Sequence, residues 1–118
     1  MASASAAQQP EAPPQYAPML AGAQQQAFDD PAWRFEPKMD GIRALATVTT
    51  DATKLVSRNG RDLTPHYPEL ANLAQYVNAI NAVIDGEIVT TDDRGRPSFE
   101  RLQQRMGLTN PRDIERIR

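Results

Sequence analysis

The sequence contains no cysteine, so disulfide bonds and thiolate metal sites are excluded and a reducing compartment is favoured. It has no window that approaches the roughly 20 apolar residues a membrane-spanning helix needs. The N-terminus also lacks a basic segment followed by an apolar run, the pattern typical of a signal peptide. These absences predict a cytoplasmic protein that does not contact a membrane.

A strong charge of one sign is absent as well. The formal net charge is −2 over 118 residues, so no global basic field indicates a nucleic-acid partner, and DNA binding would depend on a local patch. Hydrophobic residues make up 40% and charged residues 24%, proportions that fit one small domain. The single histidine, His66, lies beside a predicted helix start, and we interpret it as a surface or capping residue.

The first 15 residues differ in composition from the rest of the chain. They are Ala, Ser, Gln and Pro with one charge, Glu11, and cannot bury enough apolar surface to offset their ordering entropy. We expect residues 1–15 to be a disordered leader, or a linker from a larger protein. Residues 16–21 form the first apolar patch and are expected to pack on a domain that spans 16–118.

Hydrophobic periodicity predicts an α+β fold with an antiparallel sheet. Residues 42–48 alternate apolar and polar side chains, which indicates a half-buried strand. Residues 54–58 suggest a second strand, antiparallel to the first and followed by a turn at Asn59-Gly60. Residues 65–77 predict a helix, with Tyr67, Leu70, Leu73, Ala74 and Val77 on one face. Residues 82–90 predict an apolar strand around a charged centre.

The last third of the chain predicts a turn and two helices. The turn spans 92–96, and Pro97 and Ser98 then begin a helix that carries Phe99, Leu102 and Met106 inward. Asn110-Pro111 fits an N-cap followed by proline at the first helical position. Residues 91–118 carry seven arginines against five acids. This stretch either contacts DNA phosphates or is a solvated helix face.

Residues 36–43, EPKMDGIR, place one lysine in a polar, glycine-containing loop. Partial burial and a nearby cation such as Arg43 would lower the pKa of Lys38 and make it a nucleophile toward a nucleotide phosphate. Gly41 lets the backbone approach a ligand, and Glu36 can accept a hydrogen bond from an exocyclic amine. Asp40 is expected to fix the loop. The alternative is a surface hairpin loop with scattered charges, because short motifs recur by chance.

Two further segments carry chemistry-bearing residues. Residues 57–64 put Arg58 at a strand end beside a tight turn, where it can contact a phosphate or ribose, unless it is only solvated. Residues 83–89 place Asp85 and Glu87 on the same face of a predicted buried strand. Buried charge needs a partner, so this pair suggests a ligand, with Glu87 able to hold ribose hydroxyls or a magnesium ion through water. The alternative for residues 85–87 is a bulge.

Together and in this order, the three segments resemble the covalent nucleotidyltransferases: ATP-dependent DNA ligases, RNA ligases and capping guanylyltransferases. The likeness is greatest to bacterial DNA ligases of the end-joining type. It rests on WRFEPK at 33–38, RNGRDLT at 58–64, YPEL at 67–70 and PSF at 97–99. The resemblance implies a partial nucleotidyltransferase (ATP-grasp-like ligase adenylation) fold over 16–118, with an antiparallel sheet and flanking helices. By comparison with the family's layout, its later strands and OB-fold domain are expected to be absent. Its phosphate-binding lysine pair is expected to be absent too, because Lys38 and Lys54 are the only lysines.

The resemblance also implies roles. Lys38 would attack the α-phosphate of ATP to form lysyl-AMP, while Glu36 contacts adenine, Arg43 and Arg58 contact ribose and phosphates, and Glu87 contacts ribose hydroxyls. Mg²⁺, or Mn²⁺, would be required, with its ligands left open apart from Glu87 through water. AMP would then pass to nicked or broken duplex DNA, in a protein that includes other end-joining domains.

Two other kinds of function are compatible with these residues. An RNA ligase or capping enzyme shares the lysine chemistry, and a non-catalytic nucleotide- or DNA-binding remnant is the alternative from another class. We expect the chain to be the N-terminal part of a ligase adenylation domain. Alone it is expected to be inactive, or limited to self-adenylation.

Overall fold

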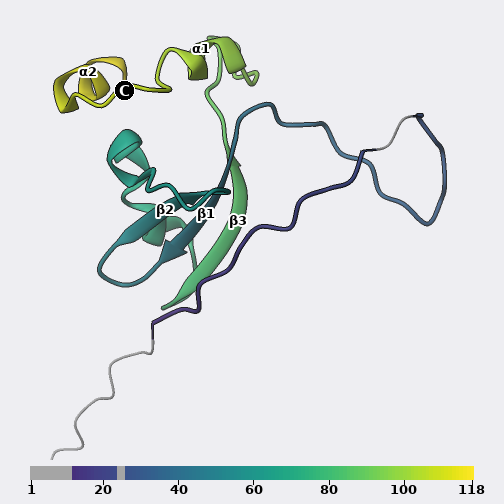
Figure 1. Ribbon diagram of the computed structural model, residues 1–118, viewed down its shortest axis with the longest axis horizontal. Coiled ribbons are helices and arrows are strands. Elements are labelled where there is room, and N and C mark those ends of the chain that lie inside the picture. Colours follow the sequence, from purple (N-terminus) through teal and green to yellow (C-terminus); the bar gives the residue numbers. More distant parts are fainter. Residues whose placement is uncertain (1–11, 24–25) are drawn as a thin grey trace, which may run out of the picture.

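A three-stranded antiparallel sheet forms the centre of the protein (Figure 1). The computed structural model describes residues 12–23 and 26–118. The strand order is β2-β1-β3, with β1 at Ile42–Val48, β2 at Thr53–Ser57 and β3 at Ala82–Ile88. The predicted antiparallel strands and the turn after β2 are confirmed, and Gly60 has the positive φ of 83° that this turn requires.

The register determines which side chains share a face of the sheet. β1 pairs with β2 through Ala46↔Leu55 and with β3 through Leu45↔Asp85. Pairing with β3 is continuous from Ile42↔Ile88 to Val48↔Ala82, so a bulge at residues 85–87 is ruled out. Side chains alternate along each strand, so the face of Ala44, Ala46 and Val48 is opposite the face of Arg43, Leu45 and Thr47.

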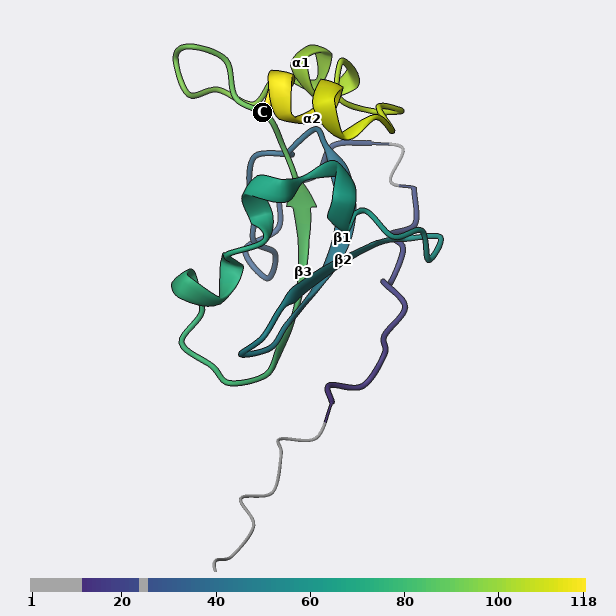
Figure 2. The same ribbon diagram turned by 90° about the vertical axis from the view of Figure 1, so that its left-hand side faces the viewer.

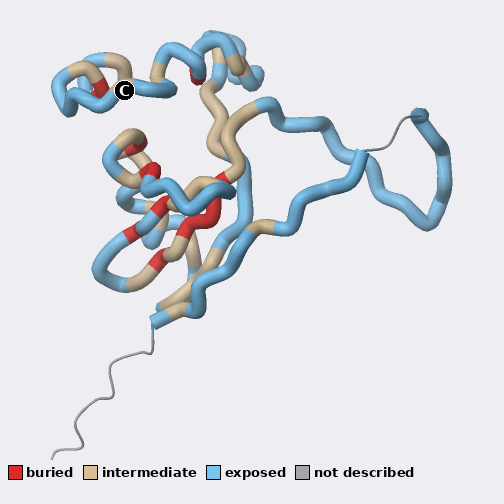
Figure 3. Tube along the Cα trace, viewed as in Figure 1, coloured by how far each residue is buried: buried red, intermediate tan, exposed pale blue. Residues whose placement is uncertain are grey.

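The core lies on one face of the sheet. The buried residues around it are Ala44, Ala46, Val48, Leu55, Leu63, Tyr67 and Leu102, with Val48 only 1% exposed and Leu102 fully buried. Figure 3 shows these buried positions along the strands and the segment beside them, with most of the surrounding chain exposed. The opposite face carries the candidate site.

The predicted helix over 65–77 is wrong. The segment forms three short 3₁₀ helices, η1 at Thr64–His66, η2 at Pro68–Leu70 and η3 at Leu73–Tyr76 (Figure 2). Pro68 has no backbone N–H and restricts the preceding residue, and Tyr67 has non-helical angles of φ −133° and ψ 66°. The apolar pattern still covers the core, because Tyr67 is buried and Leu70 and Leu73 pack against it.

Two short helices lie beyond one end of the sheet, α1 at Phe99–Gln103 and α2 at Pro111–Ile117. The predicted cap is confirmed, because the Arg112 backbone N–H donates to Asn110 Oδ1 at 2.9 Å. Ser98, expected at the start of the preceding helix, is the N-cap of α1, and its Oγ accepts from the Arg101 backbone N–H at 3.3 Å. Leu102 and Phe99 pack inward as predicted. The prediction for Met106 is wrong: it is 45% exposed, because α1 ends at Gln103.

The N-terminal segment forms neither helix nor strand over residues 12–23. Of the predicted leader, residues 1–15, the structure describes only residues 12–15. The rest of this prediction lies outside the described residues. The expected packing of the 16–21 patch is limited, since Tyr16, Met19 and Leu20 are 62%, 85% and 59% exposed. Contact with the sheet is made through Tyr16, which lines one cavity with Leu45 and Val83, and through the Met19 carbonyl. Within the described part of the chain, no helix is both long and apolar enough to cross a bilayer.

Candidate active site

Lys38 lies in the loop that leads into β1. It is exposed, and within residues 12–23 and 26–118 its amine makes no hydrogen bond or ion pair. The start of this loop is shaped by an aromatic cluster, in which the Phe28 ring lies 5.4 Å from Trp33 and 5.3 Å from Phe35, centroid to centroid. The nucleophile candidate is therefore free to meet a ligand.

Gly41 connects the lysine loop to β1. A Cβ on this residue would overlap the carbonyl oxygen of Ile88 and come within 2.9 Å of Val89 Cγ1. The sequence analysis predicted that Gly41 lets the backbone approach a ligand. In the structure, the close approach is to the backbone at the end of β3, which fixes the loop against the strand that carries Glu87.

Arg43 is held by two partners. Its Nε and Nη2 donate to the two carboxylate oxygens of Asp85 at 2.7 and 2.6 Å, and its Nη1 donates to the Met19 carbonyl oxygen at 2.9 Å. The hydrogen bond to Asp85 raises the pKa of Arg43, and the same bond lowers the pKa of the Asp85 carboxyl. The sequence analysis missed this pair, because it joins residues 42 apart in sequence through the β1–β3 register.

A first groove of about 730 Å³ gathers most of the predicted site residues. We call it the lysine groove; its charged lining residues are Glu36, Lys38, Arg43, Asp85 and Glu87. The prediction that Asp85 and Glu87 lie on a buried strand is wrong, since both are exposed. β3 is one of the two edge strands of the sheet, and its Asp85 and Glu87 side chains are accessible in the lysine groove.

A second cavity, of about 530 Å³, adjoins the lysine groove and is called the arginine cavity here. Arg43 and Glu87 line both spaces, and Arg58, Arg61 and Arg105 are added only here. The Arg58 and Arg61 side chains have no ion-pair partner among the described residues. The structure thus places Arg58 one cavity away from Lys38, on the other side of Arg43 and Glu87.

Arg105 forms one wall of the arginine cavity and is 10% exposed. It donates to both carboxylate oxygens of Glu69 and to the His66 carbonyl, and its guanidinium lies 4.9 Å from the Tyr67 ring centroid. The sequence analysis missed Arg105, whose partners come from a distant segment. His66 Nδ1–H donates to the Leu108 carbonyl at 2.8 Å, so His66 is a half-buried structural residue.

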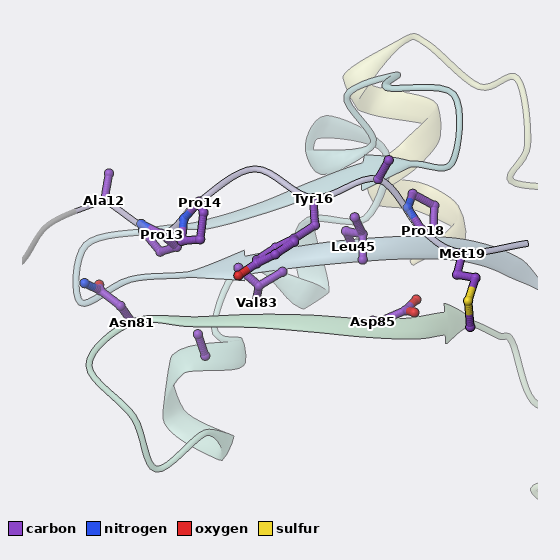
Figure 4. Close-up of a pocket in the computed structure, with 12 residues that line it drawn as sticks. Ala12, Pro13, Pro14, Tyr16, Pro18, Met19, Leu45, Asn81, Val83 and Asp85 are labelled. Carbon is purple, nitrogen blue, oxygen red and sulfur yellow. The ribbon is translucent and has the colours of Figure 1, made fainter.

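A third cavity, of about 960 Å³, lies between residues 12–19 and the sheet (Figure 4). It is lined by Tyr16, Leu45, Val83 and Asp85 among others, and it does not include Lys38. It meets the candidate site at two residues, Asp85 and Met19, which both accept hydrogen bonds from Arg43.

The other charged residues bear on two predictions, the one for a metal site and the one for the arginine-rich stretch 91–118. Within the described residues, no group of three or more His, Asp or Glu could hold a metal ion. Four arginines of the 91–118 stretch pair with acids of the same stretch, namely Arg96 with Asp92, Arg101 with Asp93, Arg116 with Asp113 and Arg118 with Glu115. Arg105 differs, since it pairs with the distant Glu69. The local pairing of the other four is what the solvated-face interpretation predicts.

The fold and the two cavities define a domain that presents a lysine, arginines and carboxylates along two adjoining spaces. A family model described as "ATP dependent DNA ligase domain" matches residues 18–117. The chain belongs to this family of ATP-dependent DNA ligase domains, and the resemblance seen in the sequence is confirmed.

Bacterial ligases are among the similar proteins. LigD of Mycobacterium tuberculosis, a multifunctional non-homologous end joining DNA repair protein, is 45% identical over 73 residues, which are 62% of this chain and 10% of LigD. DNA ligase C1 of Mycolicibacterium smegmatis is 42% identical over 97 residues, 79% of this chain and 28% of that protein. The chain therefore spans only a small part of these relatives.

Solved structures agree with the fold. A mycobacterial DNA ligase D complexed with ATP and MES aligns with a TM-score of 0.55 and 42% identity, over 61% of this chain and 24% of that one. The ligase domain of M. tuberculosis LigD aligns with a TM-score of 0.54 and 41% identity, over 64% and 25%. The predicted partial ligase fold is confirmed.

Proposed function

We propose that this chain supplies the lysine-bearing part of an ATP-dependent DNA ligase that acts in bacterial end joining. One observation carries the proposal. Glu36, Lys38, Arg43 and Glu87 come from two distant segments and line one groove. The names of the relatives, and the ATP complex of one of them, agree with ATP and DNA as substrates.

In the proposed first step, Lys38 attacks the α-phosphorus of ATP. The neutral Nζ forms a P–N bond, the bond from the α-phosphorus to the bridging oxygen breaks, pyrophosphate leaves, and Nζ loses a proton. Arg43 contributes positive charge beside the transferring group, and Glu36 and Glu87 orient the base and the ribose. Transfer of this kind depends mainly on positioning and charge neutralisation, which these side chains can provide.

The site fits Mg²⁺ only as an ion carried by the nucleotide. Asp85 is already bonded to Arg43, so Glu87 is the one carboxylate of the pair left to contact such an ion through water. Mg²⁺ typically keeps several waters and uses one or two carboxylates together with substrate phosphates. Bound this way, Mg²⁺, or Mn²⁺ in its place, neutralises phosphate charge.

The later steps involve DNA. AMP passes from Lys38 to a DNA 5′-phosphate, which restores the lysine, and a 3′-hydroxyl then attacks that phosphate and releases AMP. We propose Arg58 and Arg61 of the arginine cavity as contacts for phosphates during these steps, because neither has an internal partner among the described residues. The whole reaction is proposed for the ligase of which residues 16–118 form part of the adenylation domain.

Label transfer tests this proposal. The purified chain is incubated with Mg²⁺ and ATP carrying ³²P at either the α or the γ position. We expect only the α label to become covalently attached. Lys38→Ala should abolish attachment, and Lys54→Ala should retain it, because Lys54 is the only other lysine and lies on β2. Equal labelling of the two variants would contradict the proposal.

One observation favours a second function, nucleotide binding without catalysis. Arg43 is already engaged by Asp85 and by the backbone of Met19. If that arrangement persists, ATP binds and no label is transferred. Calorimetry on the same sample separates this result from a chain that does not bind ATP.

A further inference from the structure

Residues 12–19, called the strap here, run across the sheet face that carries Arg43 and Asp85 (Figure 4). Tyr16 of the strap lies beside Val83 and Leu45 in this view. Leu45 is on the face opposite the core and is nevertheless only 8% exposed. The strap is the described segment that lies over this part of the sheet, and it reaches the candidate site at its end.

Arg43 connects the strap to the site. Its Nε/Nη2 edge is taken by Asp85, while Nη1 donates to the Met19 carbonyl oxygen at 2.9 Å. A guanidinium has one other edge that suits a phosphate, the one formed by Nη1 and Nη2. The strap carbonyl therefore engages Nη1, one of the two nitrogens whose N–H groups a nucleotide phosphate in the lysine groove would use.

We infer that the strap is a latch, released when a nucleotide phosphate takes Arg43 from the Met19 carbonyl. The inference rests on the proposed function of the lysine groove. A phosphate forms a charge-assisted hydrogen bond that is stronger than the bond to a neutral carbonyl, so the phosphate displaces the strap. Asp85 keeps its own edge of the guanidinium throughout. Because coupling between two sites is reciprocal, the docked strap lowers nucleotide affinity.

Release can be followed with one spin label. The chain has no cysteine, so Ala17→Cys, at an exposed strap position, gives a uniquely labelled full-length protein. Without ligand, Arg43→Met added to this background should increase label mobility. Arg101→Met, which removes an ion pair with Asp93 away from the strap, should leave mobility unchanged. Unchanged mobility with Arg43→Met would overturn the latch.

An ATP titration of the labelled protein tests the coupling, with binding measured by calorimetry in parallel. We expect the mobile fraction to rise together with ATP occupancy. ATP binding without a change in mobility would overturn the latch and leave the proposed function standing. If no ATP binds although Arg43→Met frees the label, the proposed function and the coupling both fail, while the docking contact is established.

A strap variant gives the reciprocal test. Tyr16→Ser removes the ring that lies beside Leu45 and Val83 and so weakens docking of the strap. ATP binding should tighten about 3- to 10-fold, the factor that corresponds to losing one modest hydrogen bond, here the bond from Arg43 to the Met19 carbonyl. Tyr76→Ser is the matched control, because Tyr76 is 81% exposed on η3 and does not contact the strap cavity. Equal ATP affinity of the two variants would contradict the latch.

Discussion

Replacing Gly41 with alanine perturbs the point at which the lysine loop crosses the end of β3. The added methyl group would overlap the Ile88 carbonyl oxygen, lie 3.0 Å from the Ile88 carbonyl carbon and 2.9 Å from Val89 Cγ1. Two of these atoms belong to the backbone and cannot rotate away. Relief therefore requires β1 and β3 to shift apart at the end that holds Lys38 and Glu87 in one groove.

The expected loss in the free energy of unfolding follows from the cost of adding one methyl group to a packed site. Forcing an extra methyl group into a packed site costs about 1–3 kcal/mol, occasionally more. A domain of this length has a free energy of unfolding of roughly 5–15 kcal/mol, so the loss is a sizeable fraction of the total. With a urea m-value of about 1–2 kcal/mol per molar, the midpoint should fall by about 1 M.

Urea unfolding followed by far-ultraviolet circular dichroism measures this change. Gly86→Ala is the control, because a Cβ there meets no atom within 4 Å and Gly86 lacks a positive φ. It should keep the midpoint or raise it slightly by restricting the unfolded chain. A Gly41→Ala midpoint equal to that of wild type would refute the packing described for the β1–β3 crossing.

Three further predictions concern the site, the arginine cavity and the core. Glu87→Gln should weaken ATP binding about tenfold in calorimetry while the urea midpoint stays unchanged, because the exposed carboxylate has no internal hydrogen bond among the described residues; an unchanged affinity would remove Glu87 from the site. Burial is the largest influence on Glu69 and disfavours its charged form, but the hydrogen bond from Arg105, a bond from the Glu69 backbone N–H and the positive charges of Arg105 and Arg118 together outweigh burial and hold the Glu69 pKa below its ordinary value. The stabilisation from Glu69 is therefore present above about pH 4 and lost as pH falls through the lowered pKa, so Glu69→Gln should lower the urea midpoint at pH 7 and flatten its decline in acid; parallel acid profiles would contradict this. Leu102→Ala should cost about 2–5 kcal/mol in urea unfolding, since Leu102 is fully buried, and a cost below about 1 kcal/mol would contradict its place in the core.

Local signals in the sequence predicted much of the fold. The alternation over 42–48, the Asn59-Gly60 turn and the Asn110-Pro111 cap each depend on neighbouring residues, and the structure confirms them. The helix over 65–77 failed because its apolar spacing was helical while Pro68 stops propagation of the α-helix. The predicted burial of Asp85 was wrong because the apolar residues beside it in sequence do not reveal that β3 is an edge strand.

The candidate site was predictable as a set of residues and not as a geometry. The motif spacing identified Lys38, Arg43, Arg58 and Glu87, and the structure brings Lys38, Arg43 and Glu87 to one groove, with Arg58 in the adjoining cavity. The pairing of Arg43 with Asp85 depends on strand register, and its contact with Met19 depends on the path of the N-terminal segment. Neither leaves a signal in local sequence.

The central claim is that Lys38 is a nucleophile toward ATP. Intact-mass spectrometry of the chain after incubation with ATP and Mg²⁺ tests it most directly, with Lys38→Ala alongside. We expect one added AMP on the wild-type chain, located on Lys38 by peptide mapping, and none on the variant. An AMP adduct on both proteins, or no adduct on a wild-type chain that is folded and binds ATP, would contradict it.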